Sequence, residues 1–557
     1  MRAPQPEVFV IGPAGAAAGP QQMGFKAYNL ARMAGAGLPV PPAFVLGTSF
    51  CRDFFERGRK LPPHMRDLLA GEIQRLEIAS GLGFGSERRP LLVSVRSGAP
   101  VSMPGMLDTV LDVGLTETTL RGLRRMTGNP RLAWDSYRRL VQSFCEIVHR
   151  RGTEAFAAIL DRNMRSAGVA RSQELDYRSL GQVAREYLAA FEAVTGRAFP
   201  QDPMEQLEAA VRAVFDSWSS ERAKEYRRLN RLADEPGTAV TIQRMVFGNA
   251  GGTSGSGVAF TRDPASGENA LYMDFLFNAQ GEDVVSGRRA VERSARAEHV
   301  LPAAFQLLQD SRRALEAEFL DAQEFEFTVE EGALFFLQTR VAKRTPWAAL
   351  RIAVEQVQEG LIDPTTALAR LESYDLDRIE EVRLSTLNRA RLLCSADSGS
   401  LGVASGAIAL DTAAAVKGAA AGKDVILVRE EASTDDVAGV AAACGVLTAL
   451  GGRTSHAAVV ARQLNKVCLV GCRDLAIDLP ARRCAIAGEW FHEGDILCLD
   501  GRAGRVFAGV PQIVIEKPTA WLAEVSKWLQ LSAAPGLPKA TADSRSAILP
   551  KGAGAGD

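Results

Sequence analysis

The sequence lacks the features that mark several large classes of protein. Its 557 residues include 65 lysines and arginines against 66 aspartates and glutamates. The chain therefore lacks the excess of positive charge that favours binding to nucleic acid or to an anionic membrane. No stretch approaches the roughly 18 apolar residues of a membrane span, and the N-terminus has no apolar run long enough for a signal peptide. The eight cysteines contain no CxxC pair, which is unlike common zinc sites. We therefore expect a cytoplasmic globular protein with reduced thiols.

The order of apolar and turn residues predicts a multidomain α/β protein. The length alone suggests about three or four folding units. A helix is expected from near Gly24 to the Gly35/Gly37 pair, and a strand at Phe44–Leu46. Helical spacing with few turn residues then indicates a helical insertion at about 115–235. Short strands return after it, and they are expected at Ala239–Val246, Gly257–Thr261, Leu271–Phe277, Phe325–Val329 and Leu334–Gln338.

Changes in composition suggest where the domains end. Residues 1–345 are expected to form a first α/β domain around the helical insertion, and 346–395 a charged helical connector. Residues 396–510 mix strands with small-residue helices, which fits a compact β/α domain. The tail, 511–557, has one amphipathic stretch at Trp521–Leu531 and is otherwise expected to be loose.

The segment GGRTSHAAVVAR, residues 451–462, predicts a turn from a strand into a helix. It follows the apolar residues Val446–Leu450, so His456 would lie in the first turn of the helix. Thr454 or Ser455 can cap the free backbone N–H groups there, and the positive end of the helix dipole favours a bound phosphoryl group. The same field disfavours an imidazolium ion and keeps the imidazole nucleophilic.

The paired glycines Gly451 and Gly452 let the backbone approach an anion closely. A single histidine at a helix N-terminus is more often structural than catalytic. The hypothesis that His456 carries a phosphoryl group therefore depends on the whole string.

That string resembles the swivelling phosphohistidine domain of enzymes that make or use phosphoenolpyruvate (PEP). The order Thr-Ser-His-Ala-Ala-Val-Val is more similar to pyruvate phosphate dikinases than to PEP synthases, and the match extends through Lys466–Cys472. The resemblance implies that His456 is the phosphoryl carrier. In plant relatives the threonine two places before the histidine is a regulatory phosphorylation site, and Thr454 holds that place here.

An arginine on a predicted strand is the first candidate for a phosphate contact. Val93–Gly98 is predicted to form a strand that places Arg96 next to a glycine bend. A guanidinium there can bridge two phosphate oxygens. For Arg96 alone, a surface arginine beside a turn would be the more probable explanation. Together with the loop Ser102–Thr109, however, the segment closely resembles the dikinase nucleotide-binding domain, which implies that Arg96 binds the triphosphate.

A lysine near the N-terminus is the second candidate. The segment GFKAYNL, residues 24–30, resembles the opening GxKxxNL of the same domain, which implies that Lys26 contacts phosphate. Phe25 and Ala27 depart from the family pattern, in which these positions hold a small or polar residue and a glycine.

Two glutamates on one predicted strand form the candidate metal site. A period of two puts Glu324 and Glu326 on one face and two phenylalanines on the other. The returning strand of this hairpin carries Gln338 and Arg340 on a shared face, so carboxylate, amide and guanidinium can meet as Mg²⁺ and polyphosphate require. A charged face on an edge strand is the alternative. The resemblance assigns the metal to Glu326 and phosphate contacts to Gln338 and Arg340.

Two further segments resemble parts of the dikinase nucleotide site. Gln243–Asn249 is similar to the strand that passes the adenine, and Ser254–Val258 is similar to a glycine-rich flap whose backbone N–H groups contact phosphates. The nucleotide contacts that this implies are Gln243, Met245, Val246, Ser254, Gly255 and Gly257.

The resemblance implies an ATP-grasp-like nucleotide-binding clamp followed by a swivelling phosphohistidine domain. ATP and Mg²⁺ would bind the clamp, His456 would take the β-phosphoryl group, and inorganic phosphate would take the γ-phosphoryl group, with release of AMP and pyrophosphate. The covalent intermediate divides one transfer into separate steps. The carrier would then pass the phosphoryl group to pyruvate.

In the family a large β/α barrel binds pyruvate, and fewer than the roughly 200 residues of a barrel follow Gly509. We therefore expect the barrel on a separate domain or chain. Two alternatives remain: a kinase of this kind for another small molecule or a glucan, and a non-catalytic nucleotide-binding regulator, for which Phe25 and Ala27 are the sequence support. A homodimer is also left open.

Overall fold

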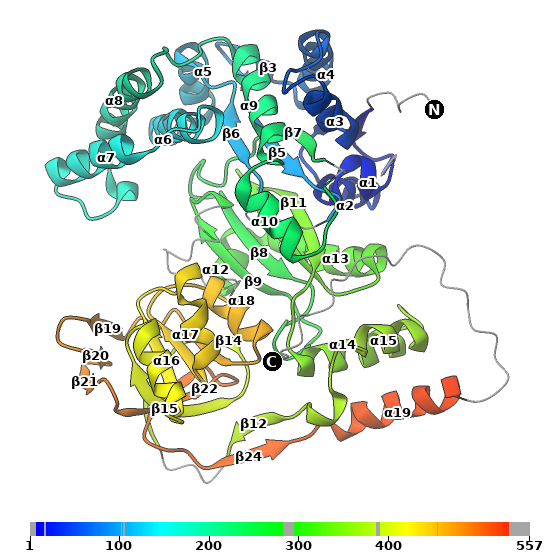
Figure 1. Cartoon of the computed structure of the whole chain (residues 1–557), viewed down its shortest axis with the longest axis vertical. Coiled ribbons are helices and arrows are strands. Elements are labelled where there is room, and N and C mark those ends of the chain that lie inside the picture. The colour runs from blue at the N-terminus through cyan, green and yellow to red at the C-terminus, as the bar shows by residue number, and fades with distance from the viewer. Residues whose placement is uncertain are drawn as a thin grey trace. The chain divides into compact units, whose positions relative to one another are not determined.

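The computed structural model of the chain divides into two compact units. It describes residues 7–15, 18–101, 103, 106–234, 237–281, 284, 294–385, 390–453 and 455–533. Unit 1 comprises the residues up to Gly251 together with Phe335–Gln338, and unit 2 comprises Gly252–Leu334 and the residues from Thr339 onward. Helices and strands are mixed in both units (Figure 1), so the chain is a multidomain α/β protein, as the sequence predicts.

Unit 1 is built on a five-stranded antiparallel sheet with the strand order β1-β2-β7-β5-β6. Its strands are β1 (Val8–Ile11), β2 (Ala43–Leu46), β5 (Val93–Gly98), β6 (Thr109–Val113) and β7 (Ala239–Arg244), and β3 (Gly83–Phe84) pairs separately with β4 (Pro90–Leu91). Its α-helices are α1 (Pro20–Met23), α2 (Phe25–Gly35), α3 (Thr48–Glu56), α4 (Met65–Ser80), α5 (Glu117–Thr127), α6 (Pro130–Ser143), α7 (Glu154–Ala167), α8 (Tyr177–Thr195), α9 (Pro203–Ser217) and α10 (Glu221–Leu229). Shorter turns are a π-helix at Phe144–Val148 and a 3₁₀-helix at Ser172–Glu174.

The helices of unit 1 begin at residues that can cap them. The Thr116 hydroxyl accepts a hydrogen bond from the Thr119 N–H at the start of α5, and Asn129 Oδ1 accepts one from the Leu132 N–H at the start of α6. Gly128 ends α5 in the left-handed conformation, with φ 60°. Helices α5 to α10 occupy 117–229, where the sequence predicts a helical insertion, and α6 and α8 lie side by side (Figure 1).

The core of unit 1 is one cluster between the sheet and its helices. Val95 of β5, Val110 of β6, Phe54 of α3 and Phe215 of α9 belong to it, and each is at most 1% exposed. Burying such side chains stabilises a fold by roughly 1.5–3 kcal/mol each. Strand β5, which carries Arg96, is thereby held rigidly in place.

Unit 2 begins with a second sheet, whose strand order is β11-β10-β8-β9. Its strands are β8 (Gly255–Phe260), β9 (Tyr272–Phe277), β10 (Gln323–Glu330) and β11 (Ala333–Val341), and the helices α12 (Ser294–Val300) and α13 (Pro302–Phe319) precede β10. These strands lie close to the predicted ranges. Strands β8 and β10 each begin two residues before the predicted Gly257 and Phe325, and β11 ends three residues after the predicted Gln338.

An eight-stranded sheet forms the second part of unit 2, with the order β13-β23-β22-β15-β16-β17-β18-β14. Its central strands β15 to β18 are parallel. Buried apolar clusters cover its two faces, and one contains residues of the helices α16, α17 and α18. Its strands are β13 (Arg391–Ser395), β14 (Asp397–Ser400), β15 (Val403–Ala409), β16 (Val425–Arg429), β17 (Gly445–Thr448), β18 (Val467–Val470), β22 (Ile496–Asp500) and β23 (Arg505–Ala508); the helices are α16 (Thr412–Ala420), α17 (Val437–Ala442) and α18 (His456–Gln463). A small antiparallel sheet is formed by β19 (Leu475–Asp478), β20 (Arg483–Ile486) and β21 (Glu489–His492), and 3₁₀-helices lie at Leu376–Arg378 and Thr434–Asp436.

The predicted connector is only partly helical. The helices α14 (Pro346–Gln358) and α15 (Pro364–Leu371) confirm its first half, but the strands β12 (Glu381–Leu384) and β13 occupy its end. Glu381 and Arg383 alternate with apolar residues, which is the strand period, and β12 pairs with β24 (Ile513–Glu516). The expectation of a helical connector up to residue 395 is therefore wrong in its last third.

The first part of the C-terminal tail contains a helix that packs against the connector. Helix α19 (Thr519–Ala533) buries Val525 and Trp528 against α14 and α15, and the rings of Trp347 and Trp521 meet edge to face at 5.3 Å. Aromatic pairs of this geometry add about 0.5–1.5 kcal/mol to the burial. The amphipathic stretch predicted at Trp521–Leu531 is confirmed as a helix, and residues 534–557, where looseness was expected, lie outside the described part.

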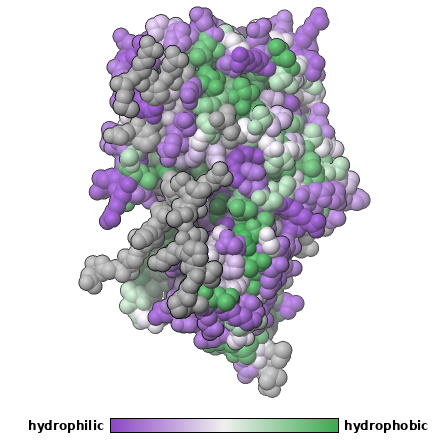
Figure 2. Space-filling view, turned by 90° about the vertical axis from the view of Figure 1, so that its right-hand side faces the viewer, coloured by the Kyte–Doolittle hydropathy of each residue, from purple (hydrophilic) through white to green (hydrophobic). Residues whose placement is uncertain are grey.

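The surface mixes polar and apolar residues. Figure 2 shows hydrophilic and hydrophobic side chains interspersed on one face. In the part of the chain that the structure describes, no helix combines the length and the apolar composition that crossing a membrane requires.

Candidate functional site

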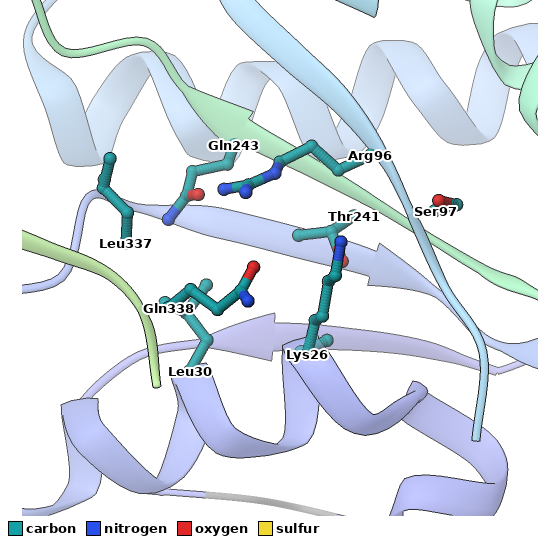
Figure 3. Close-up of a pocket in the computed structure, with 9 residues that line it drawn as sticks. Lys26, Leu30, Arg96, Ser97, Thr241, Gln243, Leu337 and Gln338 are labelled. Carbon is teal, nitrogen blue, oxygen red and sulfur yellow. The ribbon is translucent and has the colours of Figure 1, made fainter. Parts of the chain in front are cut away.

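A polar pocket in unit 1 gathers several of the residues predicted to bind the nucleotide. Strand β5 contributes Arg96 and Ser97, β7 contributes Thr241 and Gln243, and α2 lines the opposite side (Figure 3). The space between these side chains is small and opens to solvent. The lining residues are Lys26, Ala27, Leu30, Arg96, Ser97, Thr241, Gln243, Leu337 and Gln338.

The register of the sheet explains why these side chains converge. Arg96 lies directly opposite Thr241 on the neighbouring strand, and residues directly opposite point to the same face. Gln243 follows two residues after Thr241, so it shares that face. Gln338 reaches the pocket from β11, which is held to this unit by the hydrogen bond from the Phe336 N–H to the Pro39 carbonyl, 2.8 Å long. Figure 3 shows the ends of Arg96, Lys26 and Gln338 directed into one space.

Lys26 lies in the first turn of α2, where a cation is unfavourable for the helix itself. The positive end of the helix dipole repels it, and the first turn contains no acidic residue. An anion bound in the pocket would remove that repulsion. Gly24 fixes the entry to this helix, because its φ is +76° and a Cβ there would lie 2.0 Å from the Gly98 carbonyl oxygen. Phe25 begins the helix and Ala27 is buried in it, so the two departures from the family pattern leave the helix intact.

The residues predicted to pass the adenine have structural roles in this chain. Gln243 is buried and donates a 3.1 Å hydrogen bond from Nε2 to the Pro41 carbonyl. Strand β7 ends at Arg244, so Met245 and Val246 lie just beyond it; Met245 packs against the core and Val246 is buried. Only Gln243 of the three lines the pocket.

The glycines predicted to form a phosphate flap lie instead inside β8. This strand pairs with β10 on one side and with β9 on the other, which uses its backbone N–H groups in the sheet. A Cβ at Gly257 would lie 2.5 Å from Cζ of Phe327, and a Cβ at Gly255 would lie 2.1 Å from Cζ of Phe275. The two rings stack with 6° between their planes. The glycines therefore make room for aromatic packing, which corrects the flap prediction.

Ser254 is also engaged within the protein. It is buried, and its hydroxyl accepts a 2.9 Å hydrogen bond from the Glu331 N–H while its carbonyl accepts one of 2.8 Å from Asn278. It holds the ends of two hairpins together, so the predicted phosphate contact at Ser254 is corrected as well.

The predicted carboxylate face is present on β10 and β11 of unit 2. Phe325 and Phe327 are buried on one face of β10, and Glu324 on the other is ion-paired with Arg340. Burial opposes the charged form of Arg340, but the carboxylates of Glu324 and Glu326 raise its pKa above the ordinary value. Carboxylate and guanidinium thus meet as the sequence predicts.

A nucleotide-bound Mg²⁺ fits this face better than an isolated metal ion does. Among the described residues, no group of three His, Cys, Asp or Glu side chains could hold a metal. Mg²⁺ commonly takes one or two carboxylates and completes its shell with phosphates and water. Because Glu324 is committed to Arg340, the half-buried Glu326 is the better candidate ligand.

His456 is the first residue of α18, as the sequence predicts. The helix follows strand β17 through the glycine turn, in which Gly451 has φ +101° and would bring a Cβ 3.2 Å from the Ser455 hydroxyl. Gly451 and Gly452 are both buried. Ser455 is the N-cap residue, but its hydroxyl makes no capping hydrogen bond, which corrects that expectation. Thr454 lies outside the described residues.

The imidazole of His456 is set up as a neutral nucleophile. Its Nε2 is buried and has no hydrogen-bond partner in the described part of the chain. Burial lowers the pKa of His456 below its ordinary value, although the carboxylate of Asp436 acts in the opposite direction. Asp436 is itself held by hydrogen bonds from the Ser433 N–H and the Thr412 hydroxyl, of 3.0 and 2.9 Å. A neutral imidazole retains a lone pair that can attack phosphorus.

A buried arginine of the same helix, Arg462, fixes the turn before His456. Arg462 is 1% exposed, and its Nη1 donates to the carbonyls of Gly399 and Arg453 at 2.7 and 2.9 Å. Its guanidinium lies 5.6 Å from the ring centre of Phe260 on β8. Arg462 is the last residue of the motif around His456, and its role could not be predicted from the sequence.

Two comparisons with known proteins agree with this geometry. Residues 60–299 match the family model described as the pyruvate phosphate dikinase AMP/ATP-binding domain, and residues 421–504 match that of the PEP-utilising enzyme mobile domain. The chain is 42% identical over 490 residues to pyruvate, phosphate dikinase of Clostridium symbiosum, which covers 87% of this chain and 56% of that protein. The chain is related to the pyruvate phosphate dikinases. Other relatives of that name are those of Rhizobium meliloti, 40% identical over 530 residues (93% of this chain and 59% of that protein), and of Flaveria pringlei chloroplasts, 42% identical over 489 residues (87% and 51%).

The chain spans about half the length of the curated pyruvate phosphate dikinases that it matches. The match to the AMP/ATP-binding domain contains Arg96 and Gln243, and the match to the mobile domain contains His456. An AMP/ATP-binding domain of this family is consistent with an ATP-grasp-like fold, which was the expectation for the clamp.

Two groups near these sites, Thr241 and Asp436, were not predicted from the sequence. Thr241 lines the pocket beside Arg96. The polar residues at 241 and 243 alternate along β7, and this period of two indicates that Thr241 shares a face with Gln243. Asp436 acts on His456 from a separate turn, and no local pattern connects the two.

Proposed function

We propose that this chain is an ATP- and Mg²⁺-dependent phosphotransferase of the pyruvate phosphate dikinase type, which charges His456 for transfer to pyruvate. The observation that carries the proposal is the position of His456: first residue of a helix, with Nε2 buried and unpartnered in the described structure, inside a segment that matches the mobile domain. The proposed domains are a nucleotide-binding domain at 1–345, a connector at 346–395, a phosphohistidine domain at 396–510 and a tail at 511–557.

In the first step the phosphates of ATP occupy the pocket of unit 1. Lys26 and Arg96 supply positive charge there, and Gln338 supplies an amide. Arg96 extends from a rigid strand and can bridge two phosphate oxygens with its planar group. On the hairpin of unit 2, Glu326 is the proposed ligand of a Mg²⁺ ion, which would neutralise phosphate charge when bound, and Arg340 is a proposed phosphate contact.

His456 then accepts the β-phosphoryl group. Its Nε2 forms a bond to the β-phosphorus as the bond from that phosphorus to the oxygen of AMP breaks, and inorganic phosphate removes the γ-phosphoryl group as pyrophosphate. The N-terminal N–H groups of α18 and their dipole stabilise the anion that is now attached to the histidine. The low pKa of His456 keeps the attacking nitrogen unprotonated at neutral pH.

Labelled ATP tests the charging step directly. With Mg²⁺ and phosphate, [β-³²P]ATP should leave an acid-labile label on the protein, whereas the label of [γ-³²P]ATP should leave as pyrophosphate. His456→Asn should abolish labelling, because asparagine cannot form the phosphoramidate, and the exposed His492 provides a matched control as His492→Asn. Unlabelled wild-type protein, or a His456→Asn variant labelled as well as the wild type, would refute the proposal.

The acceptor step rests on the names of the relatives. Adding pyruvate together with a pyruvate-binding barrel, as a separate protein or as part of a longer chain, should move the label from His456 into phosphoenolpyruvate. If pyruvate and a barrel leave the label in place while another small molecule or a glucan removes it, pyruvate is not the acceptor. The proposed charging of His456 would be unaffected by that result.

A further inference from the structure

Two cysteines of the phosphohistidine domain bring their sulfur atoms into contact. Cys394 lies on β13 and Cys472 follows β18, and their Sγ atoms are 3.4 Å apart. Both belong to the same apolar cluster, with exposures of 7% and 0%. All eight cysteines of the chain are free thiols in the structure. The two sulfurs lie far apart in sequence but at hydrogen-bond distance in space.

The surroundings of Cys472 favour its thiolate form. The contact with Cys394 lowers the pKa of Cys472, and the backbone N–H groups of Asp474 and Leu475 lower it further, although burial acts in the opposite direction. Burial raises the pKa of the Cys468 and Cys498 thiols to about 12 in the same sheet. A thiolate is the form that reacts with oxidants. Cys472 is thus distinguished from its neighbours by its donors.

We propose that Cys394 and Cys472 form a redox-active dithiol that a peroxide closes into an intramolecular disulfide. The Cys472 thiolate attacks one peroxide oxygen and displaces hydroxide, which gives a sulfenic acid. The Cys394 sulfur then attacks the sulfenic sulfur; the S–S bond forms as the S–O bond breaks, and the departing oxygen leaves as water after taking up protons. In sum, two thiols and one hydrogen peroxide give one disulfide and two waters.

The position of the pair connects it to the carrier turn. Bond formation needs the sulfurs to approach from 3.4 Å to about 2.05 Å. The Cys472 N–H donates to the carbonyl of Thr448 at 2.9 Å, and Thr448 is the last residue of the strand before His456. Gly471 lies so close to this turn that a Cβ on it would be 2.9 Å from the Gly451 carbonyl oxygen. The disulfide would join two residues separated by 78 positions, which restricts the unfolded chain and raises the melting temperature.

Peptide mapping of the oxidised native protein tests the proposal. The full chain is treated with hydrogen peroxide under native conditions, its remaining thiols are blocked, and it is digested without reductant. We expect a peptide pair linked through Cys394 and Cys472, a loss of two titratable thiols, and recovery of both with dithiothreitol. Oxidation should also raise the melting temperature of the wild-type protein.

Matched variants separate this pair from the other thiols. Cys394→Ala and Cys472→Ala should each lose the linked peptides and the rise in melting temperature, whereas Cys498→Ala, in the same sheet, should keep both. The charge of Cys472 influences Cys484, so a Cys472–Cys484 link is the competing product. That link, or thiols that react only after unfolding, would overturn the proposal, and the wild-type map decides this even if a variant fails to fold.

Discussion

In the proposed function, the pocket of unit 1 and the helix of His456 in unit 2 bind phosphoryl groups by different means. The pocket uses side-chain charge, with Lys26 and Arg96 directed into a space open to solvent. The carrier site uses a neutral imidazole at a helix N-terminus, whose dipole is equivalent to roughly half an elementary charge. Full cations hold an anion by charge alone, whereas the carrier would hold its phosphoryl group through a bond to nitrogen, and the helix dipole would only stabilise the attached anion.

This difference suits a donor site and a carrier. The donor must bind a polyphosphate of several negative charges, for which guanidinium and ammonium groups are the usual partners. The carrier must take one phosphoryl group and give it up again, and its nucleophile must be unprotonated when it does so. The pKa of His456 is lowered by burial, while no shift of that kind is needed for an arginine that is always charged.

Removing the guanidinium from the pocket should have the largest effect on the donor side. Arg96→Ala should slow single-turnover labelling of His456 by roughly 10²–10³-fold, the usual cost of losing a group that stabilises charge in a transition state. Arg96→Lys should recover only part of the rate, because an ammonium cannot bridge two oxygens in one plane. Rapid-quench measurement with [β-³²P]ATP gives the rate.

The exposed Arg88 on the loop before β4 provides the control. Arg88→Ala should label at the wild-type rate, and the melting temperature of Arg96→Ala should be close to that of the wild type. Wild-type labelling by Arg96→Ala would mean that the pocket is not the donor site.

The proposed metal site predicts different roles for the two glutamates of β10. Glu326→Gln should raise the Mg²⁺ concentration for half-maximal labelling by about tenfold, because a neutral amide is a weaker ligand than a carboxylate. Glu324→Gln should instead lower the melting temperature, since it leaves the half-buried Arg340 without its ion-pair partner. Mg²⁺ titrations and thermal unfolding of both variants distinguish these outcomes. Equal effects on Mg²⁺ would show that both carboxylates bind the metal.

The start of the His456 helix could be predicted from local sequence patterns, whereas the role of the glycines in β8 could not. A helix N-terminus is determined by residues within one turn, so the string around His456 was sufficient to place it at the start of α18. The glycines of β8 are required by the rings of Phe275 and Phe327, which come from the two neighbouring strands. Glycine can be needed for backbone freedom or for space, and the sequence alone does not distinguish the two.

The same limit applies to the ends of the domains. Strand β12 pairs with β24, which lies far away in the sequence, so the end of the connector was not visible in a local window. Helix α19 was visible as an amphipathic stretch, but its packing against α14 and α15 was not. The strand β5 and the helix α2 were predicted correctly because each carries its own period and its own turn residues.

The smallest expected effect concerns the pH dependence of the carrier. Protonation of His456 removes its lone pair, so the labelling rate should fall as the pH falls through the pKa of the imidazole. Because burial lowers that pKa, the midpoint should lie below the ordinary histidine value of about 6.5. Asp436 favours the imidazolium, so Asp436→Asn should move the midpoint to still lower pH, by less than about one unit.

The neighbouring Asp435 is exposed, and Asp435→Asn is the matched control, which should leave the midpoint unchanged. Rates measured between pH 5 and 8 with a constant Mg²⁺–ATP concentration give the midpoints. A shift of the Asp436→Asn midpoint to higher pH would contradict the assigned sign and would mean that Asp436 orients the imidazole more than it charges it. A neutral carrier beside a buried carboxylate would then differ from the cationic pocket in geometry as well as in charge.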